Sequence, residues 1–142
     1  MILVLVGCSD GGETGRRPLQ SGAPPDFPQG ERTALAAGFA GHGSRALAGL
    51  LHDSIIVQPP SPESGMQGAV AIRYVSDLAT HTQVTESRLT PNAVTAEGPF
   101  VFEQGTWVLR VGDRPLTGQY TLRWRQTPAG WKVVLWRWSS FR

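Results

Sequence analysis

Residues 100–141 read FVFEQGTWVLRVGDRPLTGQYTLRWRQTPAGWKVVLWRWSSF, and this stretch decides the fold. It contains three runs rich in β-branched and aromatic residues, at 100–111, 115–127 and 131–141. Each break between two runs is short and contains a glycine, which is the spacing that β-hairpins require. The stretch therefore predicts three consecutive antiparallel strands.

Side chains alternate between two faces along a strand, so each of these strands has one face rich in aromatic residues. The residues expected to share a face are Glu103 and Trp107, then Tyr120, Leu122 and Trp124, and finally Val134, Trp136 and Trp138. If these faces are concave, the aromatic residues line a pocket. The alternative is that they fill the core, which a domain this small needs for its stability.

The region before the strands has helical spacing. Leu35 and Phe39 lie four residues apart, and Ser44 is expected to begin a second helix whose leucines form its apolar face. A third helix is expected after Gly68, with an apolar stripe of Val70, Tyr74, Val75 and Leu78. A short strand at 54–58 ends at a group of prolines.

Two further strands are expected at 84–90 and 93–98, separated by a turn at Pro91-Asn92. The order is then three helices with one early strand, followed by an antiparallel meander. Helices that cover one face of a curved antiparallel sheet are the economical packing for this order. The sequence predicts one α+β domain over residues 31–142.

Five local strings stand in order along this domain: HDSIIVQPP (52–60), GAVAIRYV (68–75), EQGTW (103–107), GQYTLRW (118–124) and GWKVVLWRWS (130–139). Together they resemble the nuclear transport factor 2-like superfamily, which includes ketosteroid isomerase and the SnoaL polyketide cyclases. The resemblance implies a cone, in which a curved antiparallel sheet packs against three N-terminal helices around a cavity. Such a cavity is the first place to look for a ligand.

The residues expected to line this cavity are Tyr74, Glu103, Trp107, Tyr120, Trp124, Trp136 and Trp138. Glu103 either lies near the pocket mouth or is solvated and paired with an arginine of a neighbouring strand. The resemblance places Trp136 where many members of the superfamily have an acidic residue facing the cavity. Ketosteroid isomerase chemistry requires acidic groups in an apolar pocket, and no such pair is evident.

Catalysis in the cavity would require a carboxyl group whose pKa is raised by its surroundings. The candidates are Asp53, Glu86 and Glu103, although Asp53 is expected to cap the turn before the first strand. His42, His52 and His81 are scattered, and no metal-binding, nucleophile or phosphate-loop motif is present. We therefore expect no metal and no cofactor.

The formal net charge is +2, which does not favour a nucleic-acid partner without a clustered basic face. The single cysteine, Cys8, excludes an intrachain disulfide. It ends the apolar run MILVLVGC at residues 1–8, and LVGC (5–8) resembles a lipobox, the bacterial lipoprotein signal. The resemblance implies cleavage before Cys8 and a diacylglyceryl group on its thiol. The alternative is that residues 1–6 form a buried strand and Cys8 is a core thiol.

The apolar run is shorter than a typical signal peptide and has no Lys or Arg before it, so we expect the signal to begin upstream of Met1. Residues 9–30 contain five Gly and four Pro and have no strand or helix periodicity. Such a segment cannot bury enough apolar surface to offset its ordering entropy, and it is expected to be a tether.

The leading hypothesis is a membrane-tethered lipoprotein of the bacterial cell envelope, with its domain outside the cytoplasm. The domain is expected to bind a small apolar ligand or a protein partner without catalysis. One alternative is a small enzyme of the isomerase or cyclase type. Another is a scaffold whose open sheet face forms a homodimer, which requires an exposed apolar surface.

Overall fold

The computed structural model describes residues 28–42 and 44–142 of the chain. The expected lipobox around Cys8 lies outside these residues, as does the expected tether except for its last three positions. The described helices are α2 (Gln29–Ala37), α3 (Ser44–Gly49) and α4 (Ala69–His81), with a π-helical turn η1 (Gly38–His42) between α2 and α3. The described strands are β2 (Leu51–Gln58), β3 (Met66–Gln67), β4 (Val84–Glu97), β5 (Phe100–Val111), β6 (Arg114–Thr127) and β7 (Gly130–Trp138).

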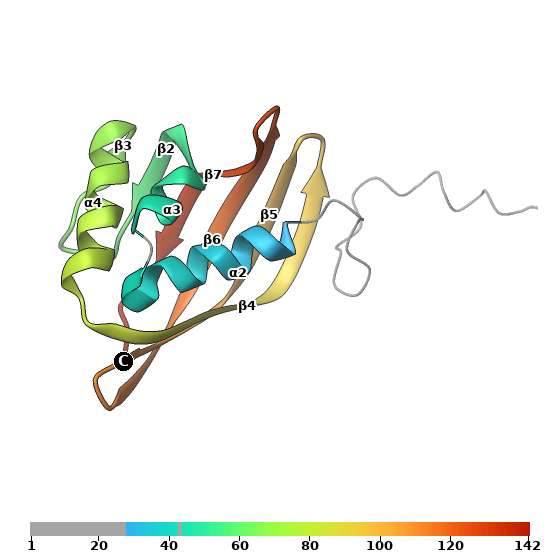
Figure 1. The fold of residues 1–142 in the computed structure, drawn as a ribbon. Helices are drawn as coiled ribbons and strands as arrows, with labels where there is room; N and C mark the ends of the chain where they lie inside the picture. The colour runs from blue at the N-terminus through green and yellow to red at the C-terminus, as the bar shows by residue number, and fades with distance from the viewer. Residues whose placement is uncertain (1–27, 43) are drawn as a thin grey trace, which may run out of the picture.

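The strands form one sheet in the order β3-β2-β7-β6-β5-β4. Strand β2 pairs with β7 in parallel, and the other neighbours pair antiparallel, so the curved sheet is mixed. The helices lie together on one side of the sheet, with α2 running across its concave face (Figure 1). This arrangement confirms the α+β prediction and the cone-shaped packing that the resemblance implies.

Strand β4 is continuous from Val84 to Glu97, so the predicted turn at Pro91-Asn92 is wrong. Pro91 lies opposite Gly105 of β5, and the register shifts between Pro91 and Ala93. A Cβ atom on Gly105 would lie 2.0 Å from the Thr90 carbonyl oxygen and 2.7 Å from the Pro91 Cα. The missing side chain of Gly105 therefore lets the two backbones approach, and a bulge carries the strand through its proline.

Strand β7 also departs from strict alternation. Arg123 pairs with Leu135 and Trp124 pairs with Val133, so Val134 is an extra residue in the ladder. Val133 is buried and Val134 is only half-buried. The prediction that Val134 shares a face with Trp136 and Trp138 is wrong, because a bulge changes which residues face inward.

Helix α4 packs on the sheet through Ala71, Val75 and Ala79, which follow one another at a spacing of four. Val70 belongs to the expected apolar stripe but is 65% exposed, so its place there is wrong. One residue corresponds to about 100° of rotation around a helix, which turns Val70 away from the buried alanines. Tyr74 and Leu78 are half-buried at the edge of the same face, where they approach a cavity.

Candidate functional site

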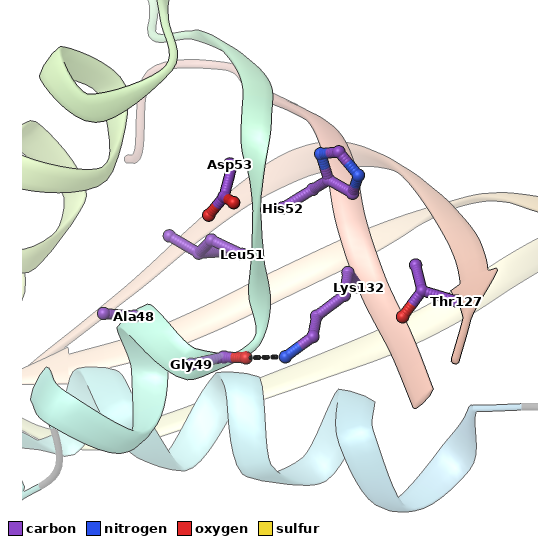
Figure 2. A pocket seen from close by; sticks show the side chains of 7 residues that line it. All are labelled: Ala48, Gly49, Leu51, His52, Asp53, Thr127 and Lys132. Carbon is purple, nitrogen blue, oxygen red and sulfur yellow. Dashed lines mark hydrogen bonds between the residues drawn. The ribbon is translucent and has the colours of Figure 1, made fainter. Parts of the chain in front are cut away.

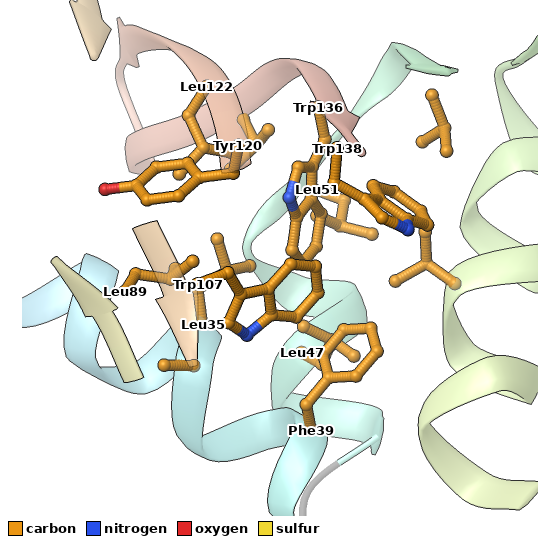
Figure 3. Packing of buried hydrophobic residues seen from close by; sticks show 14 of the residues in the cluster. Leu35, Phe39, Leu47, Leu51, Leu89, Trp107, Tyr120, Leu122, Trp136 and Trp138 are labelled. Carbon is orange, nitrogen blue, oxygen red and sulfur yellow. The ribbon is translucent and has the colours of Figure 1, made fainter. Parts of the chain in front are cut away.

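Aromatic side chains pack together in the interior of the cone, with leucines around them (Figure 3). The ring centroids of Trp107 and Trp136 lie 5.2 Å apart, and those of Trp136 and Trp138 lie 5.6 Å apart. Phe39 packs edge-on against Trp107 at 5.0 Å. The alternative that aromatic residues form the core therefore holds for the centre of the domain, where Trp136 is fully buried.

An apolar cavity of about 210 Å³ remains at one end of this aromatic core. It lies between α4, the C-terminal residues and the adjoining ends of β4, β5 and β6. Its lining residues are Phe39, Pro60, Glu63, Tyr74, Leu78, Thr82, Val84, Trp107, Leu109, Val111, Leu116, Trp138 and Phe141. A dry cavity of about 150 Å³ is large enough for benzene, so this one has room for a small ligand.

The C-terminal residues close one side of the cavity. The backbone amides of Arg142 and Thr117 each donate to the other residue's carbonyl, at 3.1 and 3.0 Å. This pairing sets the Phe141 ring over Gly118, where a Cβ atom would lie 3.0 Å from the ring. Phe141 also packs against Trp107, with 5.3 Å between ring centroids.

The structure places only some of the expected pocket residues at this cavity. Tyr74, Trp107 and Trp138 line it. Trp136 lies behind them in the core, while Glu103, Tyr120 and Trp124 belong to a separate buried cluster. Sequence reasoning did not single out Phe39 or Phe141 as pocket residues. Phe39 was visible as part of the helical stripe, whereas nothing in the local pattern showed that Phe141 folds back over Gly118.

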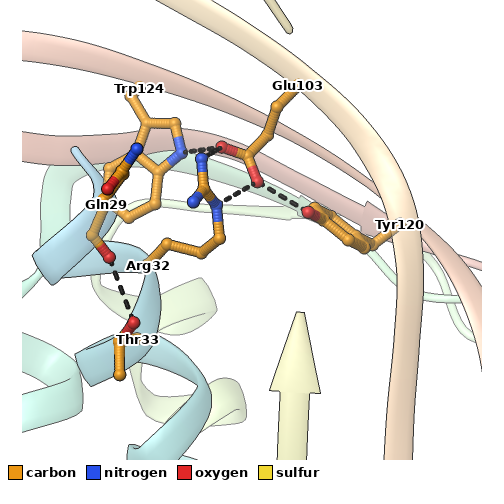
Figure 4. A network of polar contacts seen from close by, with 6 residues as sticks. All are labelled: Gln29, Arg32, Thr33, Glu103, Tyr120 and Trp124. Carbon is orange, nitrogen blue, oxygen red and sulfur yellow. Dashed lines mark hydrogen bonds and ion pairs between the residues drawn. The ribbon is translucent and has the colours of Figure 1, made fainter. Parts of the chain in front are cut away.

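The buried cluster centres on the carboxylate of Glu103 (Figure 4). Arg32 of α2 donates through Nε to Oε2 at 2.9 Å and through Nη2 to Oε1 at 3.0 Å. The Tyr120 hydroxyl donates to Oε2 at 2.6 Å, and Trp124 Nε1 donates to Oε1 at 3.1 Å. Glu103 is only 1% exposed, so it lies neither at the pocket mouth nor in solvent beside an arginine of a neighbouring strand. Both sequence-based alternatives for its position are wrong, because its partner comes from a helix.

The cluster also affects Tyr120. Burial, followed by the negative charge of Glu103 and the hydrogen bond to it, raises the pKa of the Tyr120 hydroxyl, although Arg32 opposes this. The hydroxyl therefore stays protonated and donates to the carboxylate over the physiological pH range. Each carboxylate oxygen of Glu103 accepts two hydrogen bonds, so the arrangement holds a charge in place and leaves no free lone pair aimed at a ligand.

A second hollow, of about 360 Å³, is an open groove beside β2 and β7 (Figure 2). Its side chains include those of His52, Asp53 and Lys132. His52 Nδ1 accepts a hydrogen bond from the Ser54 amide at 3.0 Å, and the Lys132 ammonium donates to the Gly49 carbonyl. His52 and Asp53 point to opposite sides of β2, so they do not form an acid–base pair (Figure 2).

Asp53 lies inside strand β2 and is exposed. Its carboxylate forms no hydrogen bond within residues 28–42 and 44–142, so the expected capping of the preceding turn is not found there. Glu86 is exposed on β4 and accepts a hydrogen bond from Arg110 Nε at 3.2 Å. None of the three carboxyl candidates therefore lines the apolar cavity.

Across the described part of the chain, no group of three or more His, Cys, Asp or Glu side chains is placed to hold a metal ion. Among the same residues, no helix combines the length and apolar character needed to cross a membrane.

No protein-family model and no curated protein matches the sequence. Solved structures do match its fold. An NTF2-like protein with a cystatin-like fold from Novosphingobium aromaticivorans superposes with a TM-score of 0.62 at 20% identity, over 77% of this chain and 79% of that one. A candidate ketosteroid isomerase from Parabacteroides distasonis gives a TM-score of 0.60 at 18% identity, over 72% and 79% of the two chains.

A candidate calcium/calmodulin-dependent protein kinase type II association domain from Thiobacillus denitrificans gives a TM-score of 0.68 at 19% identity, over 81% of this chain and 95% of that one. The last two neighbours carry different functional descriptions on one architecture, so the similarity concerns the fold and not the activity. The mixed sheet, the three helices on its concave face and these superpositions together identify the fold of this chain as nuclear transport factor 2-like.

Proposed function

We propose that this domain binds a small apolar ligand without catalysing its conversion. The observation that carries the proposal is the apolar cavity of about 210 Å³, which the aromatic core leaves open between α4 and the C-terminal residues. Transfer of an apolar molecule from water into such a site is favourable by about 25 cal/mol per Å² of buried apolar area. Tyr74, Thr82 and Glu63 provide the few polar groups that would orient the ligand.

The arrangement of carboxyl groups supports binding over proton transfer. A general base must lie within hydrogen-bonding reach of the proton that it removes. Glu103 is held by donors on three side chains in a separate cluster, and Glu86 and Asp53 are exposed. The neighbour described as a candidate ketosteroid isomerase keeps an enzyme among the alternatives, but Trp136 fills the position where the resemblance implies an acid.

The scaffold alternative receives less support from the sheet surface. A homodimer of this kind needs an exposed apolar face. Ile56, at 38%, and Val70, at 65%, are the exposed large hydrophobic residues of the described chain, and they do not form a patch on one sheet face. On the outer face the Arg123 guanidinium lies 4.1 Å from the centroid of the Phe100 ring and shields it.

We further propose that the protein is a lipoprotein anchored through Cys8 in a bacterial cell envelope, since LVGC precedes a segment rich in Gly and Pro. Several acyl chains would hold the domain at the bilayer. The test is to express the full gene, separate membrane from soluble fractions and analyse Cys8 by mass spectrometry. Cys8→Ser should release a folded protein, and a soluble protein with an unmodified Cys8 would contradict the proposal.

Benzene is a suitable probe for the cavity itself. A ligand that binds only the folded state raises the melting temperature in proportion to the logarithm of its concentration, once that exceeds the dissociation constant. Leu116→Trp should fill the cavity and abolish the shift, whereas Val70→Trp adds the same side chain at an exposed position and should keep it. No shift in the unaltered protein would contradict binding of a purely apolar ligand. Turnover of a 3-oxo-Δ5 steroid that Asp53→Asn abolishes would favour the enzyme.

A further inference from the structure

The apolar cavity has an unusual combination of lining groups. Five of its residues are aromatic, namely Phe39, Tyr74, Trp107, Trp138 and Phe141, and they come from four separate parts of the chain. Glu63 is the charged side chain among the lining residues, and no Lys or Arg is among them. We propose that this cavity binds a small alkylammonium cation, with the aromatic rings around its alkyl groups and the Glu63 carboxylate at the mouth. The inference rests on the proposed function and refines it for the same site, since such a ligand is apolar except for one positive charge that its alkyl groups surround.

Phe39, Trp138 and Phe141 each pack against Trp107 at a steep angle, and all four residues also line the cavity. Trp107 stands at 88° to Phe39, at 84° to Trp138 and at 72° to Phe141. Packing at these angles leaves the rings in several orientations along one wall of the cavity, and a cation is attracted to the negative face of an aromatic ring. Trp provides the strongest such attraction, and two of the five rings are those of Trp.

The position of Glu63 supplies the opposite charge. Its carboxylate forms no ion pair and no hydrogen bond within residues 28–42 and 44–142, so it has no competing partner there. Glu63 and Tyr74 both line the cavity, and after burial the negative charge of Glu63 is the second cause that raises the pKa of Tyr74. The lining therefore includes an exposed carboxylate, which favours a cation over an anion, and a phenolic oxygen that can accept a hydrogen bond.

An apolar hydrocarbon would also fill the cavity, so the test must separate charge from shape. Choline and 3,3-dimethylbutan-1-ol have nearly the same size and shape, but only choline carries a positive charge. The protein for the test is the full chain with Cys8→Ser, which prevents lipidation. Binding of each probe is followed by calorimetry and by quenching of Trp fluorescence, since Trp107 and Trp138 line the cavity.

We expect choline to bind about tenfold more tightly than its neutral analogue. A desolvated cation–π contact together with one carboxylate provides an affinity difference of this size. Glu63→Gln should reduce choline affinity about fivefold to tenfold and leave the affinity for the alcohol unchanged. Glu97→Gln is the matched control, because Glu97 is exposed at the far end of β4 and lines no part of the cavity. It should change neither affinity.

Each other outcome contradicts a stated part of the inference. If the alcohol binds as tightly as choline, or if Glu63→Gln has no more effect than Glu97→Gln, the cavity does not select a cation. If benzene raises the melting temperature but neither of these probes binds, the cation inference fails and the proposed apolar function stands. If none of the three binds, both proposals fail.

Discussion

Arg32 and Glu103 are 71 residues apart in the sequence, yet they form a two-point ion pair inside the domain at 2.9 and 3.0 Å. Arg32 is 9% exposed and Glu103 is 1% exposed. The pair connects helix α2 to the middle of β5, and the hydrogen bonds from Tyr120 and Trp124 extend it to β6. Because a buried charge is tolerated only with partners, this pair specifies where α2 lies on the sheet.

Replacement of Arg32 by Met should destabilise the domain by about 3–5 kcal/mol, because the Glu103 carboxylate would remain buried without its countercharge. Arg110→Met is the matched control, since Arg110 pairs with Glu86 at 3.2 Å on the surface, where the side chains are 45% and 63% exposed. The control should cost no more than about 1 kcal/mol. Urea denaturation measures both free energies of unfolding.

The double replacement Arg32→Met with Glu103→Gln should be more stable than Arg32→Met alone. A neutral amide costs less to bury than a carboxylate, and its oxygen still accepts a hydrogen bond from Tyr120 or Trp124. Equal costs for Arg32→Met and Arg110→Met would show that the pair does not hold α2 in place.

Tyr120 should make the domain sensitive to alkali. Its pKa is raised in the folded protein from an ordinary value of 10.0, chiefly by burial, and its hydroxyl stays protonated where the unfolded chain already ionises. Its full contribution to the free energy of unfolding is present below pH 10. Above pH 10 this contribution falls by about 1.4 kcal/mol per pH unit, because only the unfolded chain ionises there. Unfolding followed between pH 8 and 11.5 should show this slope. Tyr120→Phe should be less stable at pH 8 but have a shallower slope, and parallel slopes would contradict the assignment.

The fold could be predicted from the sequence wherever a local pattern specifies local structure. Residues 100–141 gave three strands because their alternation and glycine-containing turns are local signals. Pro91-Asn92 predicts a turn because a proline lacks the amide that a strand needs. The strand continues there because Gly105, on the neighbouring strand, has no side chain. That compensation comes from another segment, so a reading of residues 84–98 alone could not detect it.

The candidate site was less predictable for a related reason. The alternation rule placed Glu103 and Trp107 on one face correctly, and the structure buries both. The rule does not say which helix residue meets Glu103, and nothing local marks Arg32 as its partner, because a single arginine near a helix start is usually solvated. The position of Phe141 likewise depends on backbone pairing between Thr117 and Arg142, which the sequence does not display.

Gly105 should tolerate no larger residue. In Gly105→Ala the new Cβ would meet the backbone of β4 at 2.0 Å, and a backbone cannot move aside as a flexible side chain can. We expect a loss of about 3 kcal/mol or more. Gly30→Ala in α2 is the control, because nothing lies within 4 Å of its Cβ position and Ala favours a helix. A melting temperature of Gly105→Ala equal to that of Gly30→Ala would contradict the close approach of β4 and β5.

Three buried tryptophans allow the hydrogen bonds of the core to be measured separately from its packing. Trp124 Nε1 donates to Glu103 at 3.1 Å, and Trp107 Nε1 donates to Ser87 Oγ at 3.0 Å. Trp136 Nε1 has no hydrogen-bond partner among the described residues, although Trp136 is fully buried. Substitution by Phe removes a similar volume at each position. Differences in the free energy of unfolding among the three variants therefore report mainly whether the lost N–H group was hydrogen-bonded.

Trp136→Phe should therefore lower the free energy of unfolding least of the three, because it also removes a buried donor without a partner. Trp107→Phe should cost about 1 kcal/mol more, the net value of a neutral hydrogen bond. Trp124→Phe should cost most, since its hydrogen bond to a carboxylate contributes about 1.5–3 kcal/mol. Urea denaturation midpoints, compared at a common slope, give the order. If Trp136→Phe is as destabilising as Trp124→Phe, then Nε1 of Trp136 is satisfied in solution, and the aromatic core is not arranged as described.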